Sequence, residues 1–76
     1  MKYNIPSLSP REEQILWLIA QEQTSHEIGI MLHISMETAR THRKNLMQKL
    51  QARNAAGLIR RGFEVGVLQV DVAINM

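Results

Sequence analysis

Apolar residues recur every three or four positions along most of the chain, which is the spacing of one face of an α-helix. The first such stretch follows a helix-start signal in which Ser9 is the cap, Pro10 occupies the first turn and Glu12 completes a capping box. The apolar positions after it are Ile15, Leu16, Leu18, Ile19 and Ala20. The pattern predicts a helix over residues 10–21.

A second start signal follows within a few residues, with Thr24 as the cap and Glu27 as the matching glutamate. The apolar positions that share one helical face after it are Ile28, Met31 and Leu32. This spacing predicts a short helix of about two turns. We expect Met31, like Met47 further along, to fill gaps in the core with a flexible side chain.

The third predicted helix, residues 36–51, has two contrasting faces and is capped by Ser35. Its inward face carries Ala39, Leu46 and Leu50. Its outward face carries polar residues at spacings of three and four: Glu37, Arg40, Thr41, Lys44 and Gln48. A short helix, a tight turn and a longer helix with a polar outer face are typical of a helix-turn-helix.

The last part of the chain changes pattern. Asn54 is placed to cap a fourth helix, which ends near Gly66. From Val67 to Met76 apolar and polar residues alternate as in a strand, and a lone strand must pack, pair with another chain or fray. We therefore expect a compact all-α four-helix domain that contains a helix-turn-helix. Its parts are an N-terminal lead-in (1–8), the helical domain (9–66) and an irregular or strand-like apolar tail (67–76).

Composition narrows the class of protein. A chain of 76 residues is too short to divide into two cores, so we expect one domain. The chain contains no cysteine, so it has neither disulfides nor thiolate metal sites. It also contains no apolar run of the ~20 residues that a membrane span requires. We therefore expect a cytoplasmic protein. Its three histidines are poorly spaced for a metal, and no pair of acids suggests a catalytic site. We expect no enzyme activity, cofactor, metal or small-molecule substrate.

The charge is distributed unevenly along the chain. Seven basic residues and no acid lie between Thr38 and Phe63, whereas the remainder holds two basic residues and seven acids. Such a one-sided distribution favours a polyanionic partner, although a basic helix face that only meets solvent is the alternative.

The outward face of residues 36–51 suits the bases of duplex DNA. The major groove is about 12 Å wide and admits one α-helix, whose first turns reach the base edges. Arg40 and Lys44 can donate to guanine, and the methyl group of Thr41 can contact a thymine methyl. Glu37 can accept from a cytosine amine, or its charge can weaken binding to phosphate. Thr24 and Ser25 can present hydroxyls and amides to a phosphate.

Short motifs around each predicted helix start carry a family resemblance. They are Leu8-Ser9-Pro10-Arg11-Glu12, Thr24-Ser25-His26-Glu27-Ile28-Gly29, Ile34-Ser35, Thr38-Ala39-Arg40-Thr41-His42, Lys44-Asn45-Leu46, Lys49-Leu50 and Arg53-Asn54. In order and spacing they resemble the LuxR-type (GerE-type) helix-turn-helix domain from about Leu8 to Leu68. Members of that family are bacterial transcriptional regulators whose compact four-helix domains bind DNA, usually as dimers.

The resemblance implies roles for particular residues. Base contacts are expected from Arg40, Thr41 and Lys44, with Glu37 also facing the groove. Backbone contacts are expected from five residues: Thr24, Ser25, Ser35, Arg43 and Lys49. Dimer contacts are expected from the last helix, at Leu58, Phe63 and Val65. Trp17 is not implied by the resemblance, and we expect it to meet an apolar partner: the 70–76 tail, a second subunit or another protein. No sensing domain fits in front of Leu8, so we expect a stand-alone regulator that forms a homodimer on double-stranded DNA.

Departures from the family pattern keep a second hypothesis open. Trp17 stands where the family usually has a polar residue, and Glu22 stands where it often has a glycine, so the turn there either avoids the left-handed conformation or adopts it with mild strain. Glu37 likewise replaces a common glycine. Together with the apolar tail, Trp17 and Glu37 favour a protein-interaction module that sequesters or modulates a full-length regulator without binding DNA strongly.

Overall fold

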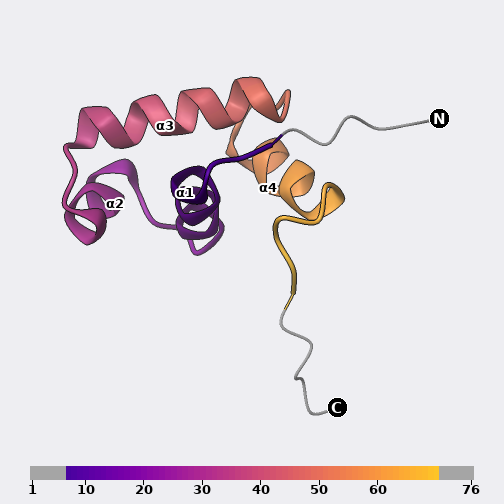
Figure 1. The fold of residues 1–76 in the computed structure, drawn as a ribbon, viewed down its shortest axis with the longest axis horizontal. Coiled ribbons are helices and arrows are strands. Elements are labelled where there is room, and N and C mark those ends of the chain that lie inside the picture. The colour runs from indigo at the N-terminus through magenta and orange to yellow at the C-terminus, as the bar shows by residue number, and fades with distance from the viewer. Residues whose placement is uncertain (1–6, 71–76) are drawn as a thin grey trace, which may run out of the picture.

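Four helices make up the part of the chain, residues 7–70, that the computed structural model describes (Figure 1). They are α1 (Pro10–Ala20), α2 (Ser25–Leu32), α3 (Met36–Lys49) and α4 (Ala55–Glu64). The expected all-α, four-helix architecture is confirmed, and residues 7–70 contain no strand. α1 and α3 end one and two residues earlier than predicted, where the chain already turns toward the next helix.

Each helix begins at the cap that the sequence predicts. At α1 the Ser9 hydroxyl accepts from the Glu12 amide at 3.1 Å, and the Glu12 carboxylate accepts from the Ser9 amide at 2.8 Å. Thr24 and Glu27 form the same capping box at α2. Ser35 and Asn54 cap α3 and α4 with their side-chain oxygens. Because these caps satisfy amides that have no partner inside the helix, the start of each helix is specified locally.

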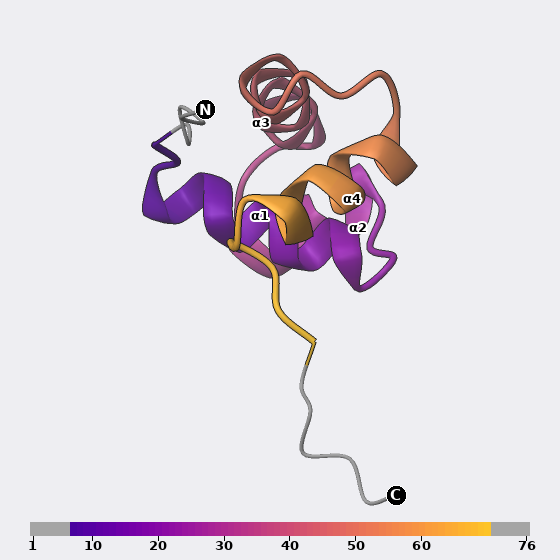
Figure 2. The same ribbon diagram turned by 90° about the vertical axis from the view of Figure 1, so that its right-hand side faces the viewer.

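The helices pack around one core, and α3 contacts all three others. In Figure 1, α3 runs across the view while α1 is seen nearly end-on; in Figure 2 it is α3 that is seen end-on. The core residues are Ile15, Leu16, Ile19, Ile28, Ala39, Leu46, Leu50, Leu58 and Leu68. The predicted inward face of α3 is confirmed, since its three marker residues are all buried.

The turn between α2 and α3 depends on a close approach at Gly29. A Cβ atom on Gly29 would lie 2.7 Å from the carbonyl oxygen of Ile34 and 3.3 Å from the amide nitrogen of Met36. His33 adopts a left-handed conformation, with φ of 58°, and the Ile34 amide donates to the Gly29 carbonyl at 2.9 Å. The turn is therefore closed tightly against α2, which fixes how α3 leaves it.

Glu22 also adopts the left-handed conformation, with φ of 67°. Of the two outcomes considered for this turn, the chain takes the one with strain, because a side chain is disfavoured at positive φ. The predicted C-terminal glycine of α4 is confirmed: Gly66 has φ of 85° directly after the cap residue Val65.

Two apolar residues differ from the prediction in how deeply they are buried. Met31 was expected in the core but is 51% exposed, because α2 is short and its packing is carried by Ile28 and the half-buried Leu32. Leu58 was expected on a partner surface but is only 1% exposed, because the inner face of α4 packs on α1 and α3. Both predictions were wrong.

The predicted apolar tail starts inside the domain. Leu68 is 2% exposed, and its amide donates to the Gly62 carbonyl at 3.0 Å. A Cβ on Gly62 would lie 2.7 Å from a Leu68 methyl carbon, so the chain folds back closely over α4. Residues 67–70 are irregular, and the rest of the predicted alternation, residues 71–76, lies outside the described residues.

Candidate nucleic-acid interface

The outward face of α3 is a continuous polar surface. Its members are exposed and follow one another at helical spacing: Glu37, Arg40, Thr41, Lys44 and Gln48. Since Ala39, Leu46 and Leu50 are buried on the opposite side, the rotation of α3 is set and this face points away from the core. The structure thus brings together all four residues that were predicted to face DNA bases.

Three of these four residues are linked to one another at the start of α3. A carboxylate oxygen of Glu37, Oε1, lies 3.0 Å from Nη1 of Arg40. The Thr41 hydroxyl donates to the backbone carbonyl of Glu37 at 3.1 Å. Lys44 lies one turn further along the same face, and no ion pair is found for it among residues 7–70.

A shallow hollow lies between the start of α2 and the start of α3. It is lined by Thr24, Ser25, His26, Met36, Arg40 and Arg43. Amides at a helix N-terminus and arginine side chains are both groups that bind phosphate. The hollow gathers Thr24, Ser25 and Arg43, which were predicted as backbone contacts, beside Arg40. His26 and Met36 were missed, although each lies in the first turn of its helix next to a recognised cap.

Two other predicted backbone contacts are engaged inside the domain. The Ser35 hydroxyl accepts from the Thr38 amide at 3.0 Å and donates to the Thr38 hydroxyl at 2.9 Å. Nζ of Lys49 lies 2.8 Å from Oε1 of Glu12, whose side chain is buried. The hydrogen bond from Lys49 is the main cause that holds the pKa of Glu12 below its ordinary value, followed by the bond from the Ser9 amide. Structural roles therefore account for both side chains.

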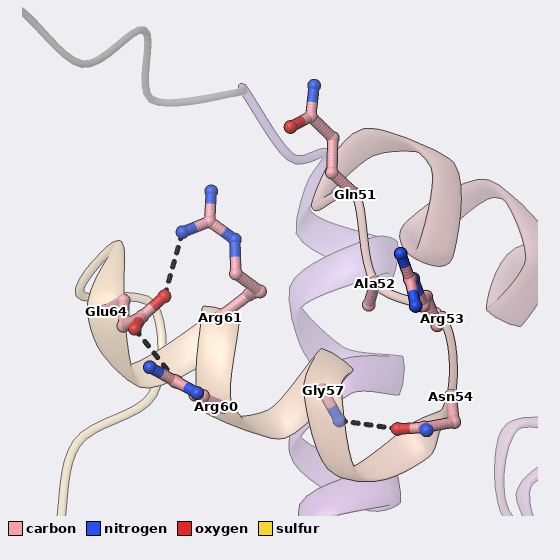
Figure 3. A pocket seen from close by; sticks show the side chains of 8 residues that line it. All are labelled: Gln51, Ala52, Arg53, Asn54, Gly57, Arg60, Arg61 and Glu64. Atoms are coloured by element: carbon pink, nitrogen blue, oxygen red, sulfur yellow. Dashed lines mark hydrogen bonds and ion pairs between the residues drawn. The ribbon is translucent and has the colours of Figure 1, made fainter.

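A second concave area, at the corner between α3 and α4, is rich in arginine (Figure 3). Here Glu64 pairs with Nε of Arg60 at 3.1 Å and with Nη1 of Arg61 at 2.8 Å, and the two arginines hold the pKa of Glu64 below its ordinary value. Arg61 also donates from Nε to the Leu50 carbonyl at 3.0 Å. Glu64 thus balances part of the positive charge of this corner.

Apolar side chains are exposed on other faces. Trp17 on α1 and Phe63 on α4 are 41% and 42% exposed, and Val65 is half-buried. These three of the four residues predicted to meet a partner retain accessible surface, whereas Leu58 does not. Ile30 and Met31 on α2 are also exposed.

Residues 7–70 show neither a candidate metal site nor a candidate membrane-spanning helix. No three histidine or acidic side chains there come close enough together to hold a metal ion. None of the helices in this range combines the length and the apolar character that crossing a membrane requires.

The geometry of α2 and α3 defines a class of protein. A short helix, a tight turn and a longer helix that presents an exposed polar face with two basic residues are the parts of a helix-turn-helix DNA-binding domain. Comparison of the sequence with known families is more specific. The model of the family "Bacterial regulatory proteins, luxR family" matches residues 6–61. The chain belongs to this family of DNA-binding transcription regulators, and the resemblance drawn from its motifs is confirmed.

Individual relatives agree with this assignment. The transcriptional regulatory protein MctR of Rhizobium johnstonii is 46% identical over 61 residues, which cover 80% of this chain and 28% of MctR. The spore germination protein GerE of Bacillus subtilis is 34% identical over 65 residues, 86% of this chain and 88% of GerE. The chain thus spans less than a third of MctR but most of GerE.

Solved structures show the same fold. The structure of the transcription factor GerE superposes with a TM-score of 0.78 at 33% identity, covering 84% of this chain and 96% of that one. A Vibrio cholera VqmA–ligand–DNA complex superposes with a TM-score of 0.76 at 22% identity, covering 88% of this chain and 29% of VqmA.

Proposed function

We propose that this chain is a sequence-specific regulator that places α3 in the major groove of double-stranded DNA and binds as a dimer. The observation that carries the proposal is the exposed polar face of α3, which continues directly into the hollow at the start of α2. A helix of 14 residues is about 21 Å long. It is therefore long enough to lie in the groove while its first turns meet the base edges.

The proposed base contacts come from residues that the structure exposes side by side. Arg40 and Lys44 donate to the O6 and N7 acceptors of guanine, and Thr41 contacts a thymine methyl. The proposed backbone contact is a phosphate seated in the hollow, held by the start of α2 and by Arg43. We do not include Ser35 and Lys49, because Thr38 and Glu12 engage their side chains.

We further propose that two copies associate through the exposed end of α4, with Phe63 and Val65 at the contact. The support is the exposure of an aromatic side chain at this end of the helix. A dimer places two copies of α3 on successive turns of the duplex, about 34 Å apart, and so predicts a site made of two half-sites.

DNA binding by this domain on its own is also part of this proposal. Its support is GerE, of which this chain covers 88%. GerE is called a transcription factor in its solved structure, and this chain covers 96% of that structure. The test is whether the purified chain alone binds its site as tightly as it does in the presence of a cell extract.

A protein-interaction module is the second candidate function. The observation that favours it is the exposure of Trp17, Ile30 and Met31, on α1 and α2 rather than on the DNA-facing helix. Exposed apolar side chains that lie together on one surface are typical of sites that bind other proteins.

Salt dependence separates the two functions. In a fluorescence anisotropy titration, a DNA-binding chain loses affinity with rising salt along a log–log slope of about −0.9 for each phosphate that it contacts. We expect a slope that corresponds to several contacts. Contacts with phosphate are strongest at low salt concentration, so about 50 mM salt is the most favourable condition for binding. Failure to bind any duplex at this concentration contradicts the DNA-binding proposal and favours the interaction module.

A further inference from the structure

We propose that Glu37 and Arg40 act as one base-reading pair that selects a G·C base pair in the half-site, with Glu37 as a specificity-determining residue. This inference rests on the proposed function. It adds to that function by naming the base pair that the start of α3 recognises.

Glu37 and Arg40 are in contact with each other at the start of α3. Oε1 of Glu37 lies 3.0 Å from Nη1 of Arg40, and the side chains are 79% and 60% exposed. Both residues belong to the first turns of α3, the part of a recognition helix that meets the base edges. The contact restrains a long side chain that would otherwise sample many rotamers. It therefore lowers the entropy that Arg40 loses when it binds a base.

The chemistry of the paired groups then selects the base pair. A guanidinium has five N–H donors, so Arg40 can keep its contact to Glu37 and still donate to O6 and N7 of a guanine. An ionised carboxylate only accepts, and its remaining lone pairs need a donor. In a G·C pair the cytosine N4 amine is that donor, beside the guanine that Arg40 binds.

Glu37 also disfavours other bases. The thymine O4 and guanine O6 atoms are acceptors, and opposite a carboxylate they leave a desolvated negative charge without a partner. A glutamate at this position therefore excludes thymine and guanine as well as accepting cytosine, which is how specificity against competitors is built. Adenine also offers an amine donor, N6, and is excluded through Arg40, because the guanine that Arg40 binds pairs with cytosine.

Glu37 also determines which part of the Thr41 side chain can contact a base. Its hydroxyl hydrogen is engaged by the Glu37 carbonyl at 3.1 Å, so this hydroxyl does not donate to a base acceptor. The methyl group remains as the contact for a neighbouring thymine. We thus expect a half-site in which a G·C pair lies next to a thymine.

Removal of the Glu37 carboxylate is a clean test because the domain does not depend on it. An exposed ion pair within one helix contributes little to folding, so Glu37→Gln and Glu37→Ala should remain folded, as circular dichroism will verify. Glu13→Gln is the matched control, since it removes the same charge from an exposed position on α1.

The experiment is a selection from a random duplex library with the full chain and each variant, followed by competition titrations on the selected site. The unaltered chain should enrich one G·C position in each half-site, and replacing that pair should weaken its binding by about tenfold or more. Glu37→Gln should accept adenine at the cytosine position, because glutamine binds adenine N6 and N7. Glu37→Ala should lose the preference without gaining another, and Glu13→Gln should keep it.

The outcomes are distinguishable. If the unaltered chain enriches no sequence, both the proposed function and this inference are wrong. If it enriches a site and both Glu37 variants keep the same preference at every position, the proposed function stands and the base-reading pair is wrong. Loss of the preference in Glu13→Gln as well would show that net charge, and not contact with a base, sets the selectivity, which also overturns the inference.

Discussion

Lys49 and Glu12, 37 positions apart in the sequence, meet at 2.8 Å and join the end of α3 to the start of α1. Oε1 of Glu12 accepts at the same time from the Ser9 amide. One buried carboxylate oxygen therefore serves both the cap of α1 and the placement of the DNA-facing helix.

The first prediction concerns this carboxylate. Glu12→Gln should lower the free energy of unfolding by about 1–2 kcal/mol at neutral pH, because it weakens a charge-assisted hydrogen bond and the capping box. Urea denaturation measures the loss, and Glu13→Gln, at an exposed neighbouring position, is the control.

The effect should depend on pH with a definite sign. The pKa of Glu12 is lowered in the folded chain, so its contribution is fully present above the pKa of the unfolded chain and is lost as pH falls through the folded value. The difference in stability between the unaltered chain and Glu12→Gln should shrink in strongly acidic solution. A difference that stays constant down to the acid transition would contradict the role of the ionised carboxylate.

The second prediction concerns the polar face of α3. Arg40→Ala or Lys44→Ala should weaken binding to the selected site by about 1–3 kcal/mol and relax discrimination at the contacted base. Arg60→Ala is the control, because Arg60 is paired with Glu64 on α4, away from this face. Equal losses in all three variants, measured by anisotropy, would indicate a general charge effect and argue against base contacts.

The third prediction concerns the core. Leu46→Ala or Leu50→Ala should cost about 2–5 kcal/mol, enough to unfold so small a domain, because each leaves a cavity at a fully buried position. Met31→Ala should change the stability by less than about 0.5 kcal/mol, because Met31 is exposed. Thermal melts followed by circular dichroism compare the three, and a native melt for either leucine variant would contradict the packing.

The fourth prediction concerns self-association. Phe63→Ser should shift sedimentation toward the monomer if the end of α4 is the dimer contact, while Ile30→Ser, at another exposed apolar position, should not. The same variant should retain α-helical circular dichroism, since Phe63 is not part of the core. An unchanged mass distribution for Phe63→Ser would place any dimer contact elsewhere.

Much of the fold is encoded over short stretches of the chain. Each helix cap accepts a hydrogen bond from an amide three residues ahead; the caps are Ser9, Thr24, Ser35 and Asn54. A few neighbouring residues are therefore enough to predict where each helix begins. The inward and outward faces of α3 follow from helical periodicity in the same way. For this reason the sequence alone was enough to predict the helix-turn-helix and to nominate the residues on its outer face.

Tertiary packing decided what periodicity could not. Met31 and Leu58 each lie on an apolar helix face, but only the arrangement of neighbouring helices determines that one is exposed and the other buried. Leu68 enters the core because the chain folds back over Gly62. The family resemblance nominated Lys49 for DNA, and its ion pair with the buried Glu12 could not be predicted because the two residues lie 37 positions apart. The sequence by itself thus determined the elements and the chemistry of the α3 face, since those interactions span a few residues. The tertiary structure decided which side chains remain available to a partner, since that depends on contacts between helices.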